Sequence, residues 1–193
     1  DFTYDSLRLS SELRPQRIDT ELNLRGQRIG ELSLQAQLDP RPANKPLSGQ
    51  FRLSGLDLAI ARPFVPMVEH LAGQLNGSGT LSGDLLKPMV NGQLALSGGE
   101  ISGGELPTSF EDLDVRVLIA GESLQLNGGW RSGERGQGTL NGALAWGGPL
   151  SGNLNVQGNR LPVTVEPYAN LEVEPDMQVR LAGDQLSVSG KVS

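Results

Sequence analysis

Hydrophobic and polar residues alternate with a period of two over much of this chain, most strictly in residues 73–85. There the odd positions hold only Gly and Leu, and the even positions hold Gln, Asn, Ser, Thr and Asp. Because successive side chains of a strand point to opposite faces, this pattern predicts a β-strand with one apolar and one polar face. After a break at Lys87-Pro88 the alternation resumes in residues 90–96, which predicts a second, adjacent strand.

The rest of the chain repeats this texture, with turn signals of Gly, Pro and Asn between the segments. Alternating segments occur in residues 7–38, 51–60, 113–126, 138–158 and 161–192. Each predicted strand keeps a polar face, as antiparallel sheets do, whereas buried parallel strands are continuously apolar. The recurrence indicates a sheet that lengthens by adding hairpin units. We expect an all-β fold, a long, curved, mostly antiparallel sheet folded into a U-shaped groove with an apolar interior.

The apolar side of the predicted sheet mixes bulky residues with Gly, so we expect a surface that has room for a guest. Gly inside a strand usually marks a bend or a close approach. The curvature of the groove is therefore assigned to five glycines, Gly77, Gly79, Gly92, Gly142 and Gly152. Its lining is assigned to Leu75, Leu81, Leu85, Val90, Leu94, Leu96, Val115, Val117, Leu124, Leu126, Leu140, Leu144, Trp146, Leu154, Val156, Val179, Leu181, Leu186 and Val188.

One short helix is expected at residues 63–72. Pro63 suits the first helical position, and Gly73 is a typical residue just after a helix. This helix would close one end of the sheet or act as a plug over the groove. His70 is the sole histidine, and one histidine without a second His or Cys makes a poor metal site.

Composition and charge narrow the possible classes of protein. With 26 Gly and 4% aromatic residues in 193, the chain suits a thin, extended sheet better than a dense globule. The net charge of −6 disfavours a nucleic-acid-binding face, and the absence of Cys excludes disulfides and thiol chemistry. We expect one elongated segment over residues 1–193, excised from a longer protein, with possible sub-units 1–72 and 73–193.

Little in the sequence supports catalysis. A single His and no Cys leave few ways to build a nucleophile with its base. Glu172 and Glu174 occupy alternate positions on a polar face, where solvated charge is usual, so we expect neither an enzyme nor a cofactor.

The motif in residues 71–96 resembles the repeated unit of the TamB family, which is related to AsmA-like proteins. That unit has the form Leu-x-Gly-x-Leu-x-Gly-x-Gly-x-Leu-x-Gly, then a spacer, then Pro-x-Val-x-Gly-x-Leu-x-Leu. Residues 175–192 look like strands of the C-terminal region of the same family. The resemblance extends over residues 49–192, and the first strands match it only in texture.

The resemblance implies an envelope protein that is anchored in the inner membrane, crosses the periplasm and works with TamA, an outer-membrane barrel assembly protein. The implied role is the insertion of outer-membrane proteins and autotransporters, or the carriage of phospholipid. Such a groove would shield acyl chains or nascent β-strands from water. Two alternatives stay open. One is a structural solenoid, barrel spacer or interaction module with a filled core. The other is a polysaccharide-active enzyme, for which we find no carboxylate or histidine cluster on one face.

Overall fold

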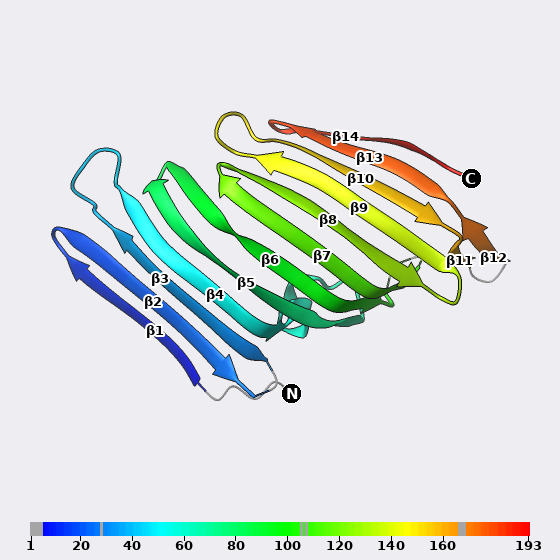
Figure 1. The fold of residues 1–193 in the computed structure, drawn as a ribbon, viewed down its shortest axis with the longest axis horizontal. Coiled ribbons are helices and arrows are strands. Elements are labelled where there is room, and N and C mark those ends of the chain that lie inside the picture. The colour runs from blue at the N-terminus through cyan, green and yellow to red at the C-terminus, as the bar shows by residue number, and fades with distance from the viewer. Residues whose placement is uncertain (1–5, 28, 105, 107, 166–168) are drawn as a thin grey trace.

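The computed structural model describes residues 6–27, 29–104, 106, 108–165 and 169–193. Twelve strands within these residues form one antiparallel sheet, and β11 and β12 form a separate hairpin (Figure 1). The elements are β1 Ser6–Arg14, β2 Arg17–Gly26, β3 Gly30–Leu38, β4 Leu47–Asp57, η1 Leu58–Phe64, β5 His70–Asp84, β6 Lys87–Ser102, β7 Phe110–Gly121, β8 Ser123–Ser132, β9 Gly136–Ala145, β10 Ser151–Asn159, β11 Leu161–Val165, β12 Ala169–Val173, β13 Pro175–Ala182 and β14 Gln185–Val192.

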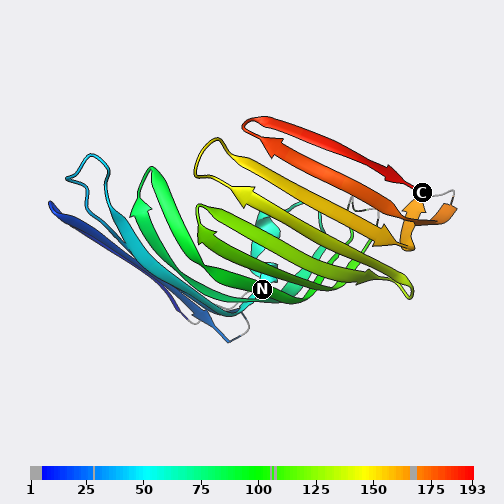
Figure 2. The same cartoon turned by 45° about the horizontal axis from the view of Figure 1, so that its top comes forward.

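The long sheet is a meander in which neighbours in sequence are neighbours in space. Its order runs from β1 to β10 and then to β13 and β14, and every pairing is antiparallel. The sheet curves, but β1 and β14 do not pair within the described part of the chain (Figure 2). The predicted all-β groove is therefore confirmed, and the closed barrel considered as an alternative is wrong.

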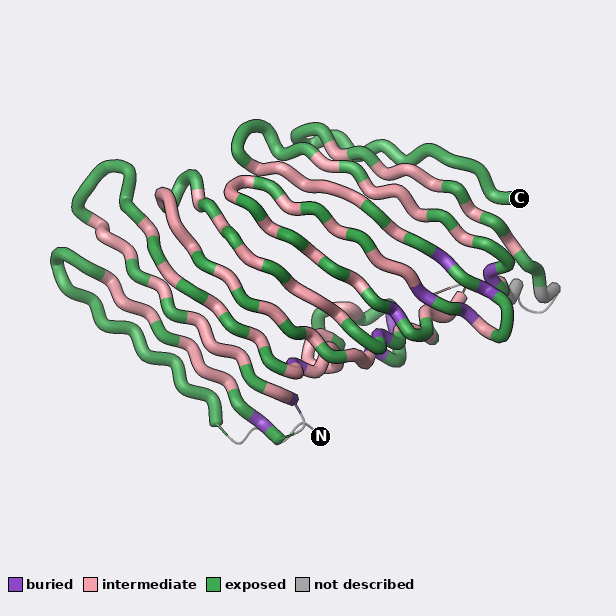
Figure 3. Tube along the Cα trace, in the orientation of Figure 1, coloured by how far each residue is buried: buried purple, intermediate pink, exposed green. Residues whose placement is uncertain are grey.

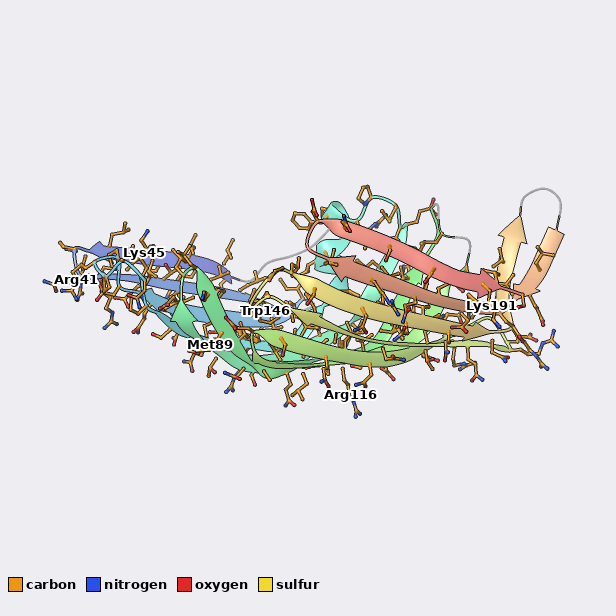
Figure 4. All side chains as sticks on the ribbon, turned by 90° about the horizontal axis from the view of Figure 1, so that it is seen from above. Arg41, Lys45, Met89, Arg116, Trp146 and Lys191 are labelled. Atoms are coloured by element: carbon orange, nitrogen blue, oxygen red, sulfur yellow. The ribbon has the colours of Figure 1, made fainter. Side chains whose placement is uncertain are left out.

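The two faces of the sheet differ as the alternation predicts. Figure 4 shows Arg116 projecting from the convex side, whereas η1 and the β11–β12 hairpin rise from the concave side. Because side chains alternate, Val115 and Val117 point to the concave face. Over residues 74–81 of β5 the polar positions are exposed, and the Leu and Gly positions between them are half-buried. The concave face is therefore the apolar one, and it is only partly covered.

Bulges bend four neighbouring strands near the same end. The register shifts between Leu53 and Leu56 in β4, and between Ala72 and Gln74 in β5. It shifts again after Leu96 in β6 and between Glu111 and Asp114 in β7. An extra residue in one strand bends it and increases its twist. Four bulges in adjacent strands therefore act together as a crease across the sheet.

Positive φ angles mark these bulges, and side chains of the adjacent strand satisfy the displaced backbone. Gly55 and Gly98 both have φ of 57°, in the left-handed region that favours glycine. The Gly55 N–H donates to Asn76 Oδ1 at 2.7 Å, and the Gly98 N–H donates to Asp114 Oδ1 at 3.1 Å. These two bulges thus have an acceptor on the next strand, which prevents an unpaired donor.

A compact hydrophobic core covers only one end of the strands. Leu113, Trp130 and Leu161 are buried together, and the rings of Phe110 and Trp130 lie 5.2 Å apart between centroids. Residues of β11 and β12 join this core, and Figure 3 shows the buried positions gathered toward that end. We call this the walled end of the groove. The opposite strand ends, at the β5–β6 and β9–β10 turns, form the open rim.

The short helix is present, but its predicted bounds of 63–72 are wrong. η1 is a 3₁₀ helix over Leu58–Phe64, and β5 already begins at His70. Asp57 starts the helix early because its side chain accepts the Ala59 N–H at 2.9 Å. Pro63 and Pro66 lack donors for a longer helix, and Leu71 instead pairs with Ile101 in the sheet.

Two other local predictions also need correction. The turn between the central strands lies at residues 85–86, and Lys87 and Pro88 belong to β6 instead of breaking the pattern. The tail does not continue the long sheet directly. β10 pairs with β13, so the intervening hairpin leaves the sheet and covers the core. The pairing of β10 with β13 is non-local, and the alternation of apolar and polar residues along one strand cannot specify it.

We predict that Gly98→Ala destabilises the chain by about 1–2 kcal/mol, because alanine is strained at positive φ. Gly148→Ala is the matched control. A Cβ at either position meets nothing within 4 Å, but only Gly98 has a positive φ. The control should change stability by less than about 0.5 kcal/mol. Urea unfolding followed by circular dichroism measures both, and equal midpoints for the two variants would contradict the strained-bulge explanation.

Candidate functional site

Two rows of apolar residues cross the concave face from edge to edge, one residue from each described strand of the long sheet. The strand registers place these residues opposite one another. The first row is Leu7, Leu24, Leu32, Leu53, Gly77, Leu94, Val117, Leu126, Gly142, Leu154, Val179 and Val188. The second row is Leu9, Leu22, Leu34, Phe51, Gly79, Gly92, Ile119, Leu124, Leu144, Gly152, Leu181 and Leu186. We call them the two apolar rows, and neither contains a polar side chain.

The dimensions of these rows follow from strand spacing. Strands lie about 4.8 Å apart, so eleven intervals give a path of roughly 50 Å along the groove. Most members of the rows are half-buried, and those on the edge strands β1 and β14 are exposed. The rows therefore present a continuous, uncharged surface that the described residues cover only in part.

The glycines in the rows receive neighbouring side chains. A Cβ built at Gly79 would lie 2.6 Å from the Phe51 ring, and one at Gly77 would lie 2.6 Å from Leu94 Cδ2. At Gly152 it would lie 3.0 Å from Leu144 Cδ1. Bulky side chains thus lean sideways over glycines instead of standing upright. This packing reduces the height of the lining side chains above the sheet. It also fills part of the space in which the sequence analysis expected a guest.

The structure brings most of the predicted lining together. The two apolar rows contain ten of the residues assigned to the lining and all five assigned glycines. A parallel row toward the walled end adds Leu75, Leu96, Val115, Leu140 and Val156. Leu81 and Val90 pair toward the open rim. Their role toward a guest, and the role of the five glycines in curvature, remain predictions.

Two predicted lining residues lie outside the strands. Leu85 is in the β5–β6 turn and is 46% exposed. Trp146 follows β9, where its backbone N–H donates to the Glu122 carbonyl and its indole Nε1–H donates to the Pro88 carbonyl at 2.9 Å. Trp146 therefore ties the β9–β10 loop to the start of β6 at the open rim.

Sequence reasoning assigned no lining residue to the first four strands. Those strands supply eight members of the two apolar rows, including Phe51 and Leu53. Their alternation was visible in the sequence, and it was sufficient to include them. They were missed because the lining was assigned only within residues 75–188, although the same alternation precedes that range.

The convex face is mainly polar. Asn155 donates to Asn141 at 3.2 Å and Gln178 donates to Asn155 at 2.9 Å, so amides form a ladder across three strands. A hollow of about 950 Å³ on this face is lined partly by Asp114, Asp176 and Lys191. Its charged walls suit water better than an apolar guest.

The electrostatics of the described residues give no sign of a reactive centre. Hydrogen bonds from Arg41 lower the pKa of the half-buried Asp39 carboxyl, and Glu12 raises the pKa of the exposed Arg14 guanidinium. Both are surface ion pairs, whereas the shifted pKa values of catalytic groups usually occur within clefts. Within the described ranges no three His, Cys, Asp or Glu side chains gather as a metal site requires. Likewise, no helix there is long and apolar enough to cross a bilayer.

Comparisons with known proteins cover most of the chain. The family model described as TamB, N-terminal domain matches residues 1–96, and the TamB C-terminal domain model matches residues 127–193. The first match includes β1–β3, where the sequence resemblance was one of texture only. A relative is the translocation and assembly module subunit TamB of Haemophilus influenzae, 23% identical over 177 residues. That alignment takes in 91% of this chain and 13% of the relative.

No solved structure matches the chain. Together the two family matches and the Haemophilus relative show that this chain belongs to the TamB family.

Proposed function

We propose that this chain is a periplasmic part of a translocation and assembly module and that its groove shields phospholipid acyl chains from water. The observation that carries the proposal is the pair of apolar rows, which cross the sheet without a polar side chain. Covering such a surface with an acyl chain is favourable by about 0.8 kcal/mol per buried methylene. The proposed action is physical shielding, without a chemical step or a cofactor.

The backbone of the sheet favours an acyl chain over a polypeptide within the groove. The N–H and C=O groups of the inner strands are already paired with neighbouring strands. A peptide lying across the apolar rows would leave its own backbone groups unsatisfied, at about 1–3 kcal/mol for each group. An acyl chain has no such groups. We therefore assign lipid to the groove and polypeptide clients to another surface.

The open shape supports a conduit over a filled structural spacer. Only the walled end has a core of buried side chains among the described residues, and the two apolar rows lie beside it in the groove. A lipid could therefore lie along the rows without displacing protein atoms from a core.

We predict that Leu94→Glu strongly weakens phospholipid binding. A carboxylate in the middle of an apolar row would have to be desolvated, which should weaken binding at least about tenfold. The matched control is Gln93→Glu, because Gln93 precedes Leu94 in β6 but is exposed on the convex face. Native mass spectrometry of each purified chain detects bound lipid, and circular dichroism checks folding. Equal lipid occupancy in the two folded variants, or none in the wild type, would rule out the groove.

The sheet edges are a second candidate site, for polypeptide clients and for a TamA-type partner. Among the described residues β14 pairs with β13 alone, and no other described strand lies along its outer edge. Unpaired edges recruit strands by backbone hydrogen bonding. The inner-membrane anchor, TamA and the outer-membrane protein or autotransporter clients all belong to this proposal.

A photo-cross-linking residue at Ser187 in β14 tests the edge. We expect adducts with TamA or with an outer-membrane client in cells that express the full-length protein. Gln125 is the control, because it lies in the same convex row as Ser187 but in the interior strand β8. Adducts of equal yield at both positions would show that the edge has no special role.

A further inference from the structure

The β5–β6 turn at the open rim has an unusual composition. Leu85 and Leu86 form its two residues, between the paired Asp84 and Lys87, and they are 46% and 83% exposed. Turns of this length favour Asn, Gly and Asp for their backbone angles. The β9–β10 and β13–β14 turns on the same rim do contain such residues, at 147–149 and 183–184. Turn formation therefore does not explain two exposed leucines.

Hydrogen bonds hold this turn against the neighbouring β3–β4 loop. The Leu85 N–H donates to the Lys45 carbonyl at 3.1 Å, and Asn44 Nδ2 donates to Asp84 Oδ1 at 3.0 Å. Pro46 and Asp84 also form a β-bridge. Residues 41–46 and 84–89 thus form one supported projection, which we call the tip. The leucines need little further ordering to make a contact.

Cations flank the two leucines. Lys45 and Lys87 form no ion pair with a described carboxylate, and Arg41 is paired with Asp39 at 2.8 Å. The nearby acids are Asp39, Asp84 and, on the next turn along the rim, Glu122. Figure 4 shows Arg41, Lys45 and Met89 in the same part of the sheet. Two unpaired lysines beside exposed leucines contrast with the net charge of −6 of the whole chain.

We propose that the tip docks on the surface of an anionic phospholipid bilayer. Leu85 and Leu86 would enter the boundary between headgroups and acyl chains, and Lys45 and Lys87 would face the phosphates. Apolar burial and attraction of lysines to anionic lipid are the two contributions that hold peripheral segments on membranes. Docking of this kind goes beyond shielding lipid in the groove, because it would set the open rim against a bilayer.

The shape of the tip favours a lipid surface over a protein partner. A stable protein interface buries about 800 Å² on each side. Two leucines on a narrow turn supply much less area, and they project outward instead of forming a pocket. A fluid bilayer accepts such a projection without a complementary surface, and its phosphates match the lysines.

Vesicle flotation of the purified chain tests the proposal. The vesicles contain phosphatidylethanolamine with phosphatidylglycerol, or phosphatidylcholine alone. We expect L85N/L86G, which installs ordinary turn residues, to lower the partition coefficient about tenfold or more. K45A/K87A should weaken binding to the anionic vesicles by about fivefold per lysine at low salt. The matched control is L118S, because Leu118 is 60% exposed but lies on the convex face.

Each result supports the proposal or overturns it. Equal flotation of L85N/L86G and L118S, or equal binding to both kinds of vesicle, would overturn it. A concentration-dependent dimer that L85N/L86G dissociates without vesicles would assign the tip to a second copy of the chain instead. The groove proposal is tested by a different readout, which is bound phospholipid. L94E should lose bound phospholipid but still float with the vesicles. L85N/L86G should keep bound phospholipid but not float.

Discussion

The sideways packing of bulky residues over glycines on the adjacent strand determines the character of the concave face. A sheet whose inner face carries only large aliphatic side chains usually packs against a second layer, because upright side chains leave gaps that need filling. Here Phe51 lies against Gly79, and Leu94 lies against Gly77. Neighbouring strands thereby satisfy part of each other's packing. The sheet can then remain a single open layer over most of its length.

Polar interactions are confined to positions where they do not interrupt this surface. The bulge glycines Gly55 and Gly98 donate to Asn76 and Asp114, which lie on adjacent strands and belong to the polar side. The crease is thus stabilised by polar side chains that point away from the two apolar rows. The core around Trp130 then closes one end with aromatic and aliphatic bulk. A rigid wall and an uncovered surface coexist because they use different segments of the same strands.

The alternation predicted the strands and their faces because its period of two is a local property of each strand. It therefore placed residues such as Leu94 and Leu154 correctly on one face, and it would have placed Phe51 there too. The bulges were harder to predict. Leu-Ser-Gly occurs at residues 47–49, 53–55, 81–83, 96–98 and 150–152, but only Gly55 and Gly98 combine a positive φ with a shift of the strand register. At these two glycines an acceptor on the next strand, Asn76 or Asp114, bonds the glycine N–H. Such a partner can be identified only once the pairing of the strands is known.

The two tryptophans stand at opposite ends of the same pair of strands, Trp130 within the core and Trp146 beside the β7–β8 turn. One indole is almost completely buried, and the other is half-exposed with its nitrogen bonded to the Pro88 carbonyl. The chain therefore contains two intrinsic fluorophores in different surroundings. Changes in the wavelength of tryptophan emission can therefore distinguish binding or unfolding at the open rim from the same process in the core around Trp130, without any added label.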